Sequence, residues 1–131
     1  MERVALRHKS AIRAVGTLRE ILGVQYSVIV RDASIQRFEY SFETLWKLLK
    51  EYLRFNDGVV CNSPKSCFKE ALSTGLLTSE DTVAFLEMTD DRNLTSHTYM
   101  EEIADTIYSN LERYCSLMEK VLEKFDTNMS V

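Results

Sequence analysis

Two long runs of apolar residues at helical spacing constrain the fold of this chain more than any other feature. The first recurs every three or four residues and comprises Ile35, Phe38, Phe42, Leu45, Leu49 and Tyr52. The second has the same spacing and comprises Ile103, Ile107, Leu111, Tyr114, Met118, Val121 and Phe125. This period is typical of amphipathic helices that pack at a shallow angle, and no long stretch alternates as a strand does. The pattern therefore predicts a helical bundle.

Start and stop signals divide the chain into about five helices. Ser63 followed by Pro64 predicts an N-cap and a first helical position. Thr98, three residues before Glu101, predicts a capping box with Thr98 as the N-cap of the last helix. The expected helices cover residues 2–22, 26–56, 64–75, a short helix capped by Thr78 or Ser79, and 98–126. In the fourth of these we expect Val83, Leu86 and Leu94 to face the core.

Length and composition fit one domain. The chain has 131 residues, four glycines and one proline, so few positions break a helix. We expect residues 1–131 to form a single all-α domain, an antiparallel up-and-down bundle of three long and two short helices.

Targeting and redox signals point to the cytoplasm. No apolar run approaches the ~20 residues that span a bilayer, so we expect no membrane contact. Charges interrupt the first residues, where a signal peptide would be apolar. Cys61, Cys67 and Cys115 have no metal-like spacing, and we expect free thiols in a reducing compartment.

The charge of −4 is unevenly distributed. Residues 1–22 carry five Lys and Arg against two acids, whereas residues 79–131 carry four against twelve. The overall charge argues against general affinity for nucleic acid. The basic first helix could pack against the acidic last helix, attract phosphate locally, or be a solvated surface. We expect His8 on this helix to be exposed.

The segment from Arg92 to Tyr99 is polar beyond what bundle packing requires. Arg92 can bind a phosphate through its planar guanidinium, and His97 can transfer a proton near neutral pH. Asn93 could hold the imidazole or the phosphate. On an unbroken helix Arg92 and His97 would point ~140° apart, so they converge only if the helix breaks near residues 95–98. This chemistry needs no metal and no cofactor.

Simpler interpretations of these side chains remain open. Arg92 could pair with Asp90 or Asp91, and His97 could merely cap a helix. A second charged group lies among aromatic residues of the long helix expected over 26–56. Its members are Arg37, Glu39, Glu43 and Lys47. These side chains either face solvent at the edge of the core or form a surface that binds a partner or substrate.

Three blocks in order carry a resemblance to a known family. They are residues 31–47, 63–71 and 91–99. Together they resemble the nucleotidyltransferase substrate-binding protein family, a branch of the HEPN superfamily, over roughly residues 5–125. The resemblance implies a HEPN-like bundle that forms homodimers and binds a separately encoded minimal nucleotidyltransferase.

The resemblance also implies roles for residues. In related HEPN toxins an Arg-x4-6-His motif forms a metal-independent RNase site across the dimer, and Arg92, Asn93 and His97 fall on it. In some toxin–antitoxin pairs the nucleotidyltransferase silences the toxin by adenylylating a tyrosine two residues after the histidine, the position of Tyr99. The family name implies an alternative, a non-catalytic subunit that presents substrate to the nucleotidyltransferase.

Overall fold

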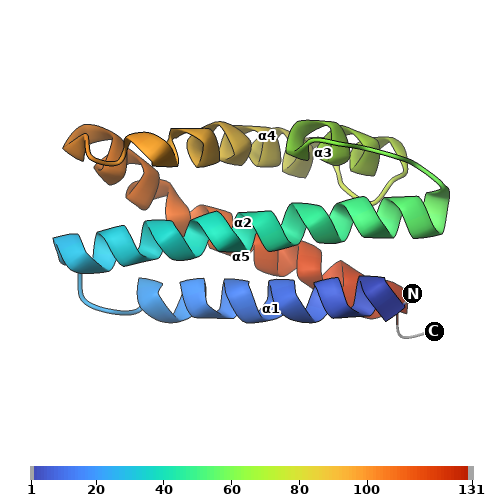
Figure 1. The fold of residues 1–131 in the computed structure, drawn as a ribbon, viewed down its shortest axis with the longest axis horizontal. Helices are drawn as coiled ribbons and strands as arrows, with labels where there is room; N and C mark the ends of the chain where they lie inside the picture. The colour runs from blue at the N-terminus through green and yellow to red at the C-terminus, as the bar shows by residue number, and fades with distance from the viewer. Residues whose placement is uncertain (1, 130–131) are drawn as a thin grey trace.

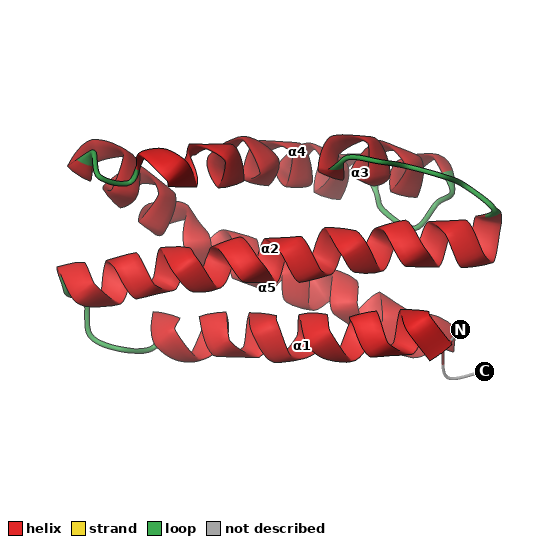
Figure 2. Cartoon of the chain, viewed as in Figure 1, coloured by secondary structure: helices red, strands yellow, loops and turns green. Residues whose placement is uncertain are grey.

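A computed structural model describes residues 2–129, with side chains described through residue 125. The described part is helical throughout and contains no strand, which confirms the predicted all-α fold (Figure 2). The elements are α1 (Glu2–Leu22), α2 (Val28–Asp57), α3 (Pro64–Ser73), α4 (Ser79–Leu94), the 3-10 helix η1 (Thr95–His97) and α5 (Glu101–Met129).

The three long helices form the body of the bundle (Figure 1). Helix α1 runs antiparallel to α2, and α5 crosses behind α2 and contacts both of them. The short helices α3 and α4 lie together on the side of α2 opposite α1. As a result α2 is the central element, and its side chains reach every other helix.

The predicted seams form the core. All six apolar positions of the first run are buried, and the second run is buried except for Ile103, which is partly buried. Aromatic rings connect the layers. Phe38 stacks on Tyr114 of α5, while Phe42 contacts Phe68 of α3, which stacks on Phe85 of α4 at 4.7 Å between ring centroids. These contacts position α4 against α2.

The ends of α2, and the starts of α3 and α4, lie at or within two residues of the predicted signals. Ser27 caps α2, which therefore begins two residues later than expected, and α2 ends where Gly58 adopts a positive φ of 65°, a conformation that glycine tolerates best. Ser63 forms a capping box with Ser66, and the Thr78 side chain caps α4. The N-caps predicted for α3 and α4 are confirmed.

Three predictions about burial were wrong. His8 is only 5% exposed, and its Nε2 lies 3.2 Å from the carbonyl oxygen of Leu122. The apolar stripe of α1 extends back through Val4 and His8 at helical spacing, so this polar residue takes a core position. Val83 and Leu94 are exposed instead of buried, because α4 contacts its neighbours through Phe85 and Met88.

The prediction of three free thiols was also wrong. Cys61 and Cys67 form a disulfide that spans the connection from α2 into α3. Cys115 is a free, buried thiol, and burial raises its pKa to about 11. The paired cysteines are six positions apart in the sequence, a spacing that alone does not distinguish a disulfide from two thiols.

The basic first helix does pack on the acidic last helix. Arg19 forms ion pairs with Glu112 at 2.6 Å and with Glu119 at 2.8 Å. Among the described residues, no helix combines the length and apolar character needed to cross a membrane.

Candidate functional site

The helix break predicted near residues 95–98 is present. Helix α4 ends at Leu94, one turn of 3-10 helix covers Thr95–His97, and α5 starts at Glu101. The Thr95 hydroxyl lies 2.7 Å from the Arg92 carbonyl oxygen. A threonine bonded to the preceding turn in this way bends or ends a helix. The segment from Arg92 to Tyr99 is therefore a junction between two helices.

The predicted cap at Thr98 was wrong. The Thr98 hydroxyl donates to the carbonyl oxygen of Thr95 at 3.1 Å, so it serves the preceding turn. The Met100 carbonyl instead accepts from the amides of Ile103 and Ala104. Because the Thr98 hydroxyl is engaged with the 3-10 turn, it does not cap α5, which starts at Glu101, three residues later than predicted.

Arg92 is held by three side chains. Its Nη1 donates to the Thr95 hydroxyl at 3.0 Å and lies 3.5 Å from Glu39 Oε2, and its Nη2 lies 3.5 Å from Glu43 Oε1. The Thr95 hydroxyl also lies 3.2 Å from Glu39. These contacts fix the guanidinium between α4 and the middle of α2.

One nitrogen of Arg92 is unsatisfied. Its Nε is buried and has no hydrogen-bond partner among the described residues, although the side chain as a whole is 27% exposed. Unpaired buried donors are rare in folded proteins. An anion that approached the exposed edge could draw the guanidinium from its carboxylates and satisfy this donor.

His97 and Tyr99 face solvent beside each other. His97 Nδ1 lies 3.5 Å from the Tyr99 hydroxyl oxygen, and the two rings meet edge to face. Tyr99 is 78% exposed, and Asn93 is also exposed. Within the described part of the chain, no hydrogen bond or ring contact joins Arg92 to His97. The chain thus presents the histidine and the arginine separately at one junction.

The other predicted residues have different neighbours. Asp91 accepts from Tyr114 at 2.6 Å and Asp90 from Lys65 at 2.7 Å, so Arg92 pairs with neither acid. Lys47 lies 3.9 Å from Glu43 and thus borders the Arg92 cluster. Arg37 points toward α1, where it donates to the carbonyl oxygen of Thr17 at 2.9 Å.

Comparison with known proteins identifies the family. The family model described as "nucleotidyltransferase substrate binding protein like" matches residues 6–127. A Haemophilus influenzae protein named "probable ribonuclease HepT" is 31% identical over 104 residues, which are 73% of this chain and 70% of that protein. The chain belongs to the nucleotidyltransferase substrate-binding protein family.

Solved structures agree with this membership. A crystal structure of a Thermus thermophilus protein has 45% sequence identity and a TM-score of 0.84, covering 87% of this chain and 97% of that one. A tri-AMPylated HEPN toxin of Shewanella oneidensis, solved in complex with an MNT antitoxin, has 14% identity and a TM-score of 0.78 over 95% of this chain and 96% of that one. At that identity the second likeness shows the fold alone.

In this family member a buried arginine fixes the start of α5, which sequence reasoning missed. Arg31 is only 2% exposed, and its guanidinium contacts Glu101 at 2.6 Å and Asp105 at 2.9 Å. These bonds lower the pKa of the Glu101 carboxyl. Arg31 falls on the apolar seam of α2, four residues before Ile35, and a charge at a seam position was the available signal.

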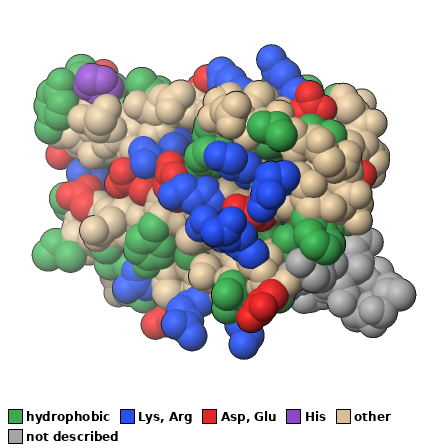
Figure 3. All heavy atoms as spheres, turned by 45° about the vertical axis from the view of Figure 1, so that its right-hand side comes forward, with side chains coloured by type: hydrophobic (Ala, Val, Ile, Leu, Met, Phe, Trp, Pro, Cys, Tyr) green, Lys and Arg blue, Asp and Glu red, His purple; other side chains and the backbone are tan. Residues whose placement is uncertain are grey.

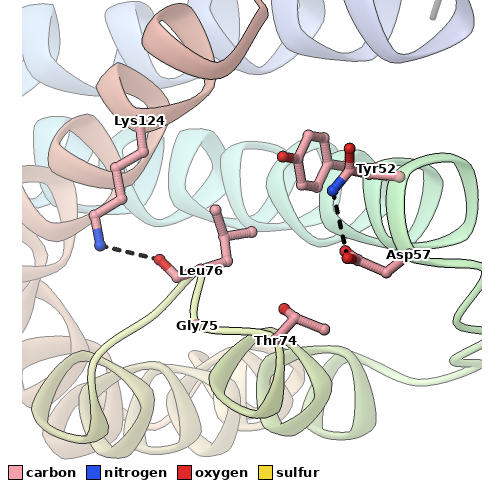
Figure 4. A pocket seen from close by; sticks show the side chains of 7 residues that line it. Tyr52, Asp57, Thr74, Gly75, Leu76 and Lys124 are labelled. Carbon is pink, nitrogen blue, oxygen red and sulfur yellow. Dashed lines mark hydrogen bonds between the residues drawn. The ribbon is translucent and has the colours of Figure 1, made fainter.

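A separate hollow lies near the C-terminal end of α2 (Figure 4). It has a volume of about 420 Å³, and Lys124 at its side donates to the carbonyl oxygen of Leu76 at 3.0 Å. Tyr52, Asp57 and Thr74 also line it. Across the described residues, no three His, Cys, Asp or Glu side chains are grouped so that they could hold a metal.

Proposed function

We propose that this chain is the HEPN-type toxin partner of a separately encoded minimal nucleotidyltransferase, and that it is a metal-independent endoribonuclease acting through Arg92, Asn93 and His97. The observation that carries this proposal is the helix junction, because it holds an arginine at its start and an exposed histidine at its end. The relative named as a probable ribonuclease supports the same activity.

The proposed reaction needs a base and a stabilising cation. His97 accepts the proton of a ribose 2′-hydroxyl, and the 2′-oxygen attacks the adjacent phosphorus. The bond to the 5′-oxygen breaks, a proton passes to that leaving oxygen, and a cyclic phosphate remains. Arg92 binds the phosphate oxygens as negative charge develops on them. Asn93, on the exposed side of the last turn of α4, orients the phosphate or the imidazole.

Glu39 and Glu43 hold Arg92 before RNA binds. Both carboxylates lie 3.5 Å from its guanidinium, a distance that favours orientation over tight pairing. A phosphodiester makes shorter, charge-assisted bonds. The carboxylates therefore position the guanidinium at the surface and then yield to the phosphate. Lys47, beside Glu43, adds positive charge to this substrate surface.

A homodimer completes the proposed site. Arg92 and His97 make no mutual contact in the described part of one chain, so a second copy is needed to bring the two groups to one phosphate. Exposed apolar side chains surround the junction: Val28 and Ile29 at the start of α2, and Leu94, Tyr99 and Met100 beside η1. The Arg31–Glu101 pair ties these two groups together, and such exposed patches commonly bind a partner.

Adenylylation of Tyr99 would silence this site. The exposed Tyr99 oxygen attacks the α-phosphorus of ATP, loses its proton and displaces pyrophosphate. The product places a phosphate and a nucleoside within about 3.5 Å of His97, where they block the approach of RNA and offer Arg92 a bound anion. The AMPylated toxin that shares this fold supports the proposal. Because the proposed reactions use RNA and ATP, we infer that the protein acts in the cytoplasm.

A second candidate is a non-catalytic subunit that binds substrate for the nucleotidyltransferase. The pairing of Arg92 with Glu39 and Glu43 favours it, because an engaged arginine is less available for chemistry. The description of the matching family model favours it as well.

A silencing experiment tests the proposal and separates the two candidates. The chain is incubated with its nucleotidyltransferase and ATP, and RNA cleavage and intact mass are followed together. We expect AMP to add to Tyr99 while cleavage is lost, and Tyr99→Phe to stay active and unmodified. Tyr26→Phe, at another exposed tyrosine, is the matched control and should behave as the wild type. A chain that binds its partner and never cuts RNA would instead support the adaptor.

A further inference from the structure

A groove between α1 and α2 lies outside the residues assigned above. It has a volume of about 420 Å³. Its lining residues are Leu6, Lys9, Ser10, Arg13, Ala14, Thr17 and Tyr40. Apart from Leu6 and Ala14, each of these carries a hydroxyl or a positive charge, and none carries a carboxylate. The composition suits an anionic ligand.

Among the described residues, no carboxylate pairs with the two cations of the groove. Lys9 and Arg13 are exposed and one helical turn apart, and within the described part of the chain neither forms a hydrogen bond or an ion pair. Arg19, further along α1, is by contrast paired with Glu112 and Glu119. Two adjacent unpaired cations repel each other, and a bound phosphate chain relieves that repulsion.

The first 75 residues are basic although the chain as a whole is acidic. Residues 1–75 carry twelve Lys and Arg against eight acids, whereas residues 76–131 carry four against twelve. In the space-filling view, Lys and Arg side chains gather over the middle of one face (Figure 3). A polyanion would therefore meet the molecule on the side built from its first helices.

An aromatic ring is fixed at the edge of the groove. Tyr40 is 40% exposed, and its hydroxyl lies 2.8 Å from the Thr17 hydroxyl of α1. This contact restrains the ring while leaving part of it open to solvent. Exposed aromatic rings beside cations are the usual means of binding single-stranded nucleic acid, since bases stack on the ring and phosphates meet the cations.

Helix α2 separates the groove from the candidate site. Tyr40 directly follows Glu39, whose carboxylate lies 3.5 Å from Arg92. A single-stranded RNA with one phosphate bound at Arg92 therefore needs to cross only the width of α2 for another phosphate to reach Lys9 and Arg13.

We propose that the groove between α1 and α2 binds the backbone of single-stranded RNA, with Lys9 and Arg13 on phosphates and a base stacked on Tyr40. The proposal deepens the function proposed above, since it rests on RNA being the substrate. It predicts that RNA is bound well beyond the cleaved bond.

The test measures binding apart from cleavage. Labelled single-stranded RNA of about 16 nucleotides is titrated with the full chain carrying His97→Ala, which blocks cleavage. We expect Lys9→Ala with Arg13→Ala to weaken binding at least about tenfold and to reduce the dependence of log K on log salt by about 1.4, the value for two lost phosphate contacts on a single strand. Tyr40→Leu should weaken binding about tenfold, whereas Tyr40→Phe, which loses the restraint from Thr17 but keeps the ring, should weaken it less.

Matched controls and a short substrate make the result decisive. Lys69→Ala with Arg113→Ala removes the same charge from other exposed positions and should change binding less than twofold. With His97 intact, the groove variants should lose more of their cleavage rate on long RNA than on a dinucleotide. Unchanged RNA binding by the groove variants would overturn the proposal, as would loss of nucleotidyltransferase binding alone, which would assign the groove to a protein. RNA binding through the groove without any cleavage would support the groove and reject the proposed RNase.

Discussion

Arg31 and Arg92 show how burial decides what an arginine does. Arg31 is 2% exposed and bonded to Asp32, Glu101 and Asp105, so its charge is used within the fold. Arg92 keeps a solvent-facing edge and sits at longer distances from its carboxylates. Only an arginine of the second kind can exchange its partners for a phosphate. Sequence reasoning found Arg92 through its polar neighbours but not Arg31, whose acids lie on another helix.

The Arg31–Glu101 pair predicts a specific acid sensitivity. Arg31 holds the pKa of Glu101 below its unfolded value, which is about 4.3. A lowered carboxyl pKa stabilises the fold above the unfolded value, and that contribution is lost as the pH falls through the folded value. The free energy of unfolding, measured in urea between about pH 6 and pH 3, should therefore fall less steeply in Glu101→Gln than in the wild type. Equal slopes in the two proteins would show that this pair does not titrate as described.

At the scale of elements, the 3-10 turn is the feature that sets the site. The spacing of apolar residues predicted α2 and α5, because a stripe repeated over many helical turns defines one face that is buried. The exact start of α5 was not predictable from its capping signal, since the Thr98 hydroxyl donates to the carbonyl oxygen of Thr95 in the preceding 3-10 turn and does not cap α5. His8 was predicted to be exposed, but it is buried. Its position on the apolar stripe of α1 faces α5, where the carbonyl oxygen of Leu122 is its hydrogen-bond partner.

Removing one hydroxyl should loosen this turn. Thr95→Val preserves shape and burial but removes the group that meets both Arg92 and Glu39. We expect a loss of about 1 to 2 kcal/mol in unfolding free energy and slower RNA cleavage, because Arg92 loses a restraint. Thr95→Ser keeps the hydroxyl and should retain most of both. Chemical denaturation and cleavage assays on the two variants provide the check. Identical behaviour of Thr95→Val and Thr95→Ser would show that the Thr95 hydroxyl contributes to neither stability nor cleavage.

At the scale of the whole molecule, the bundle leaves one end open to association. Ile29 is 81% exposed, and Met100, which precedes Glu101 in the chain, is also exposed. The sequence could not show which apolar side chains stay exposed, since exposure depends on how the helices cross. Likewise the disulfide between Cys61 and Cys67 depends on the path from α2 into α3, which no local signal specifies.

The dimer proposed from this end has a direct test. Ile29→Glu with Met100→Glu should convert the protein from dimer to monomer, because charge is costly in an apolar interface. Val83→Glu introduces a charge at an exposed apolar position of α4 and should leave the dimer intact. Light scattering after size-exclusion chromatography gives the mass of each, and a wild-type monomer would contradict the proposed assembly.

RNA cleavage in the presence of a chelator tests most directly whether the junction after α4 is a metal-independent RNase site. The purified wild-type chain should cut single-stranded RNA and leave cyclic phosphate ends. His97→Ala should lower the rate by about 10² to 10⁴, the usual contribution of general acid–base catalysis, and Arg92→Ala by about 10² to 10³, with helical circular dichroism unchanged in both. A folded wild-type chain that leaves RNA intact, or cleavage that survives in His97→Ala, would contradict the account.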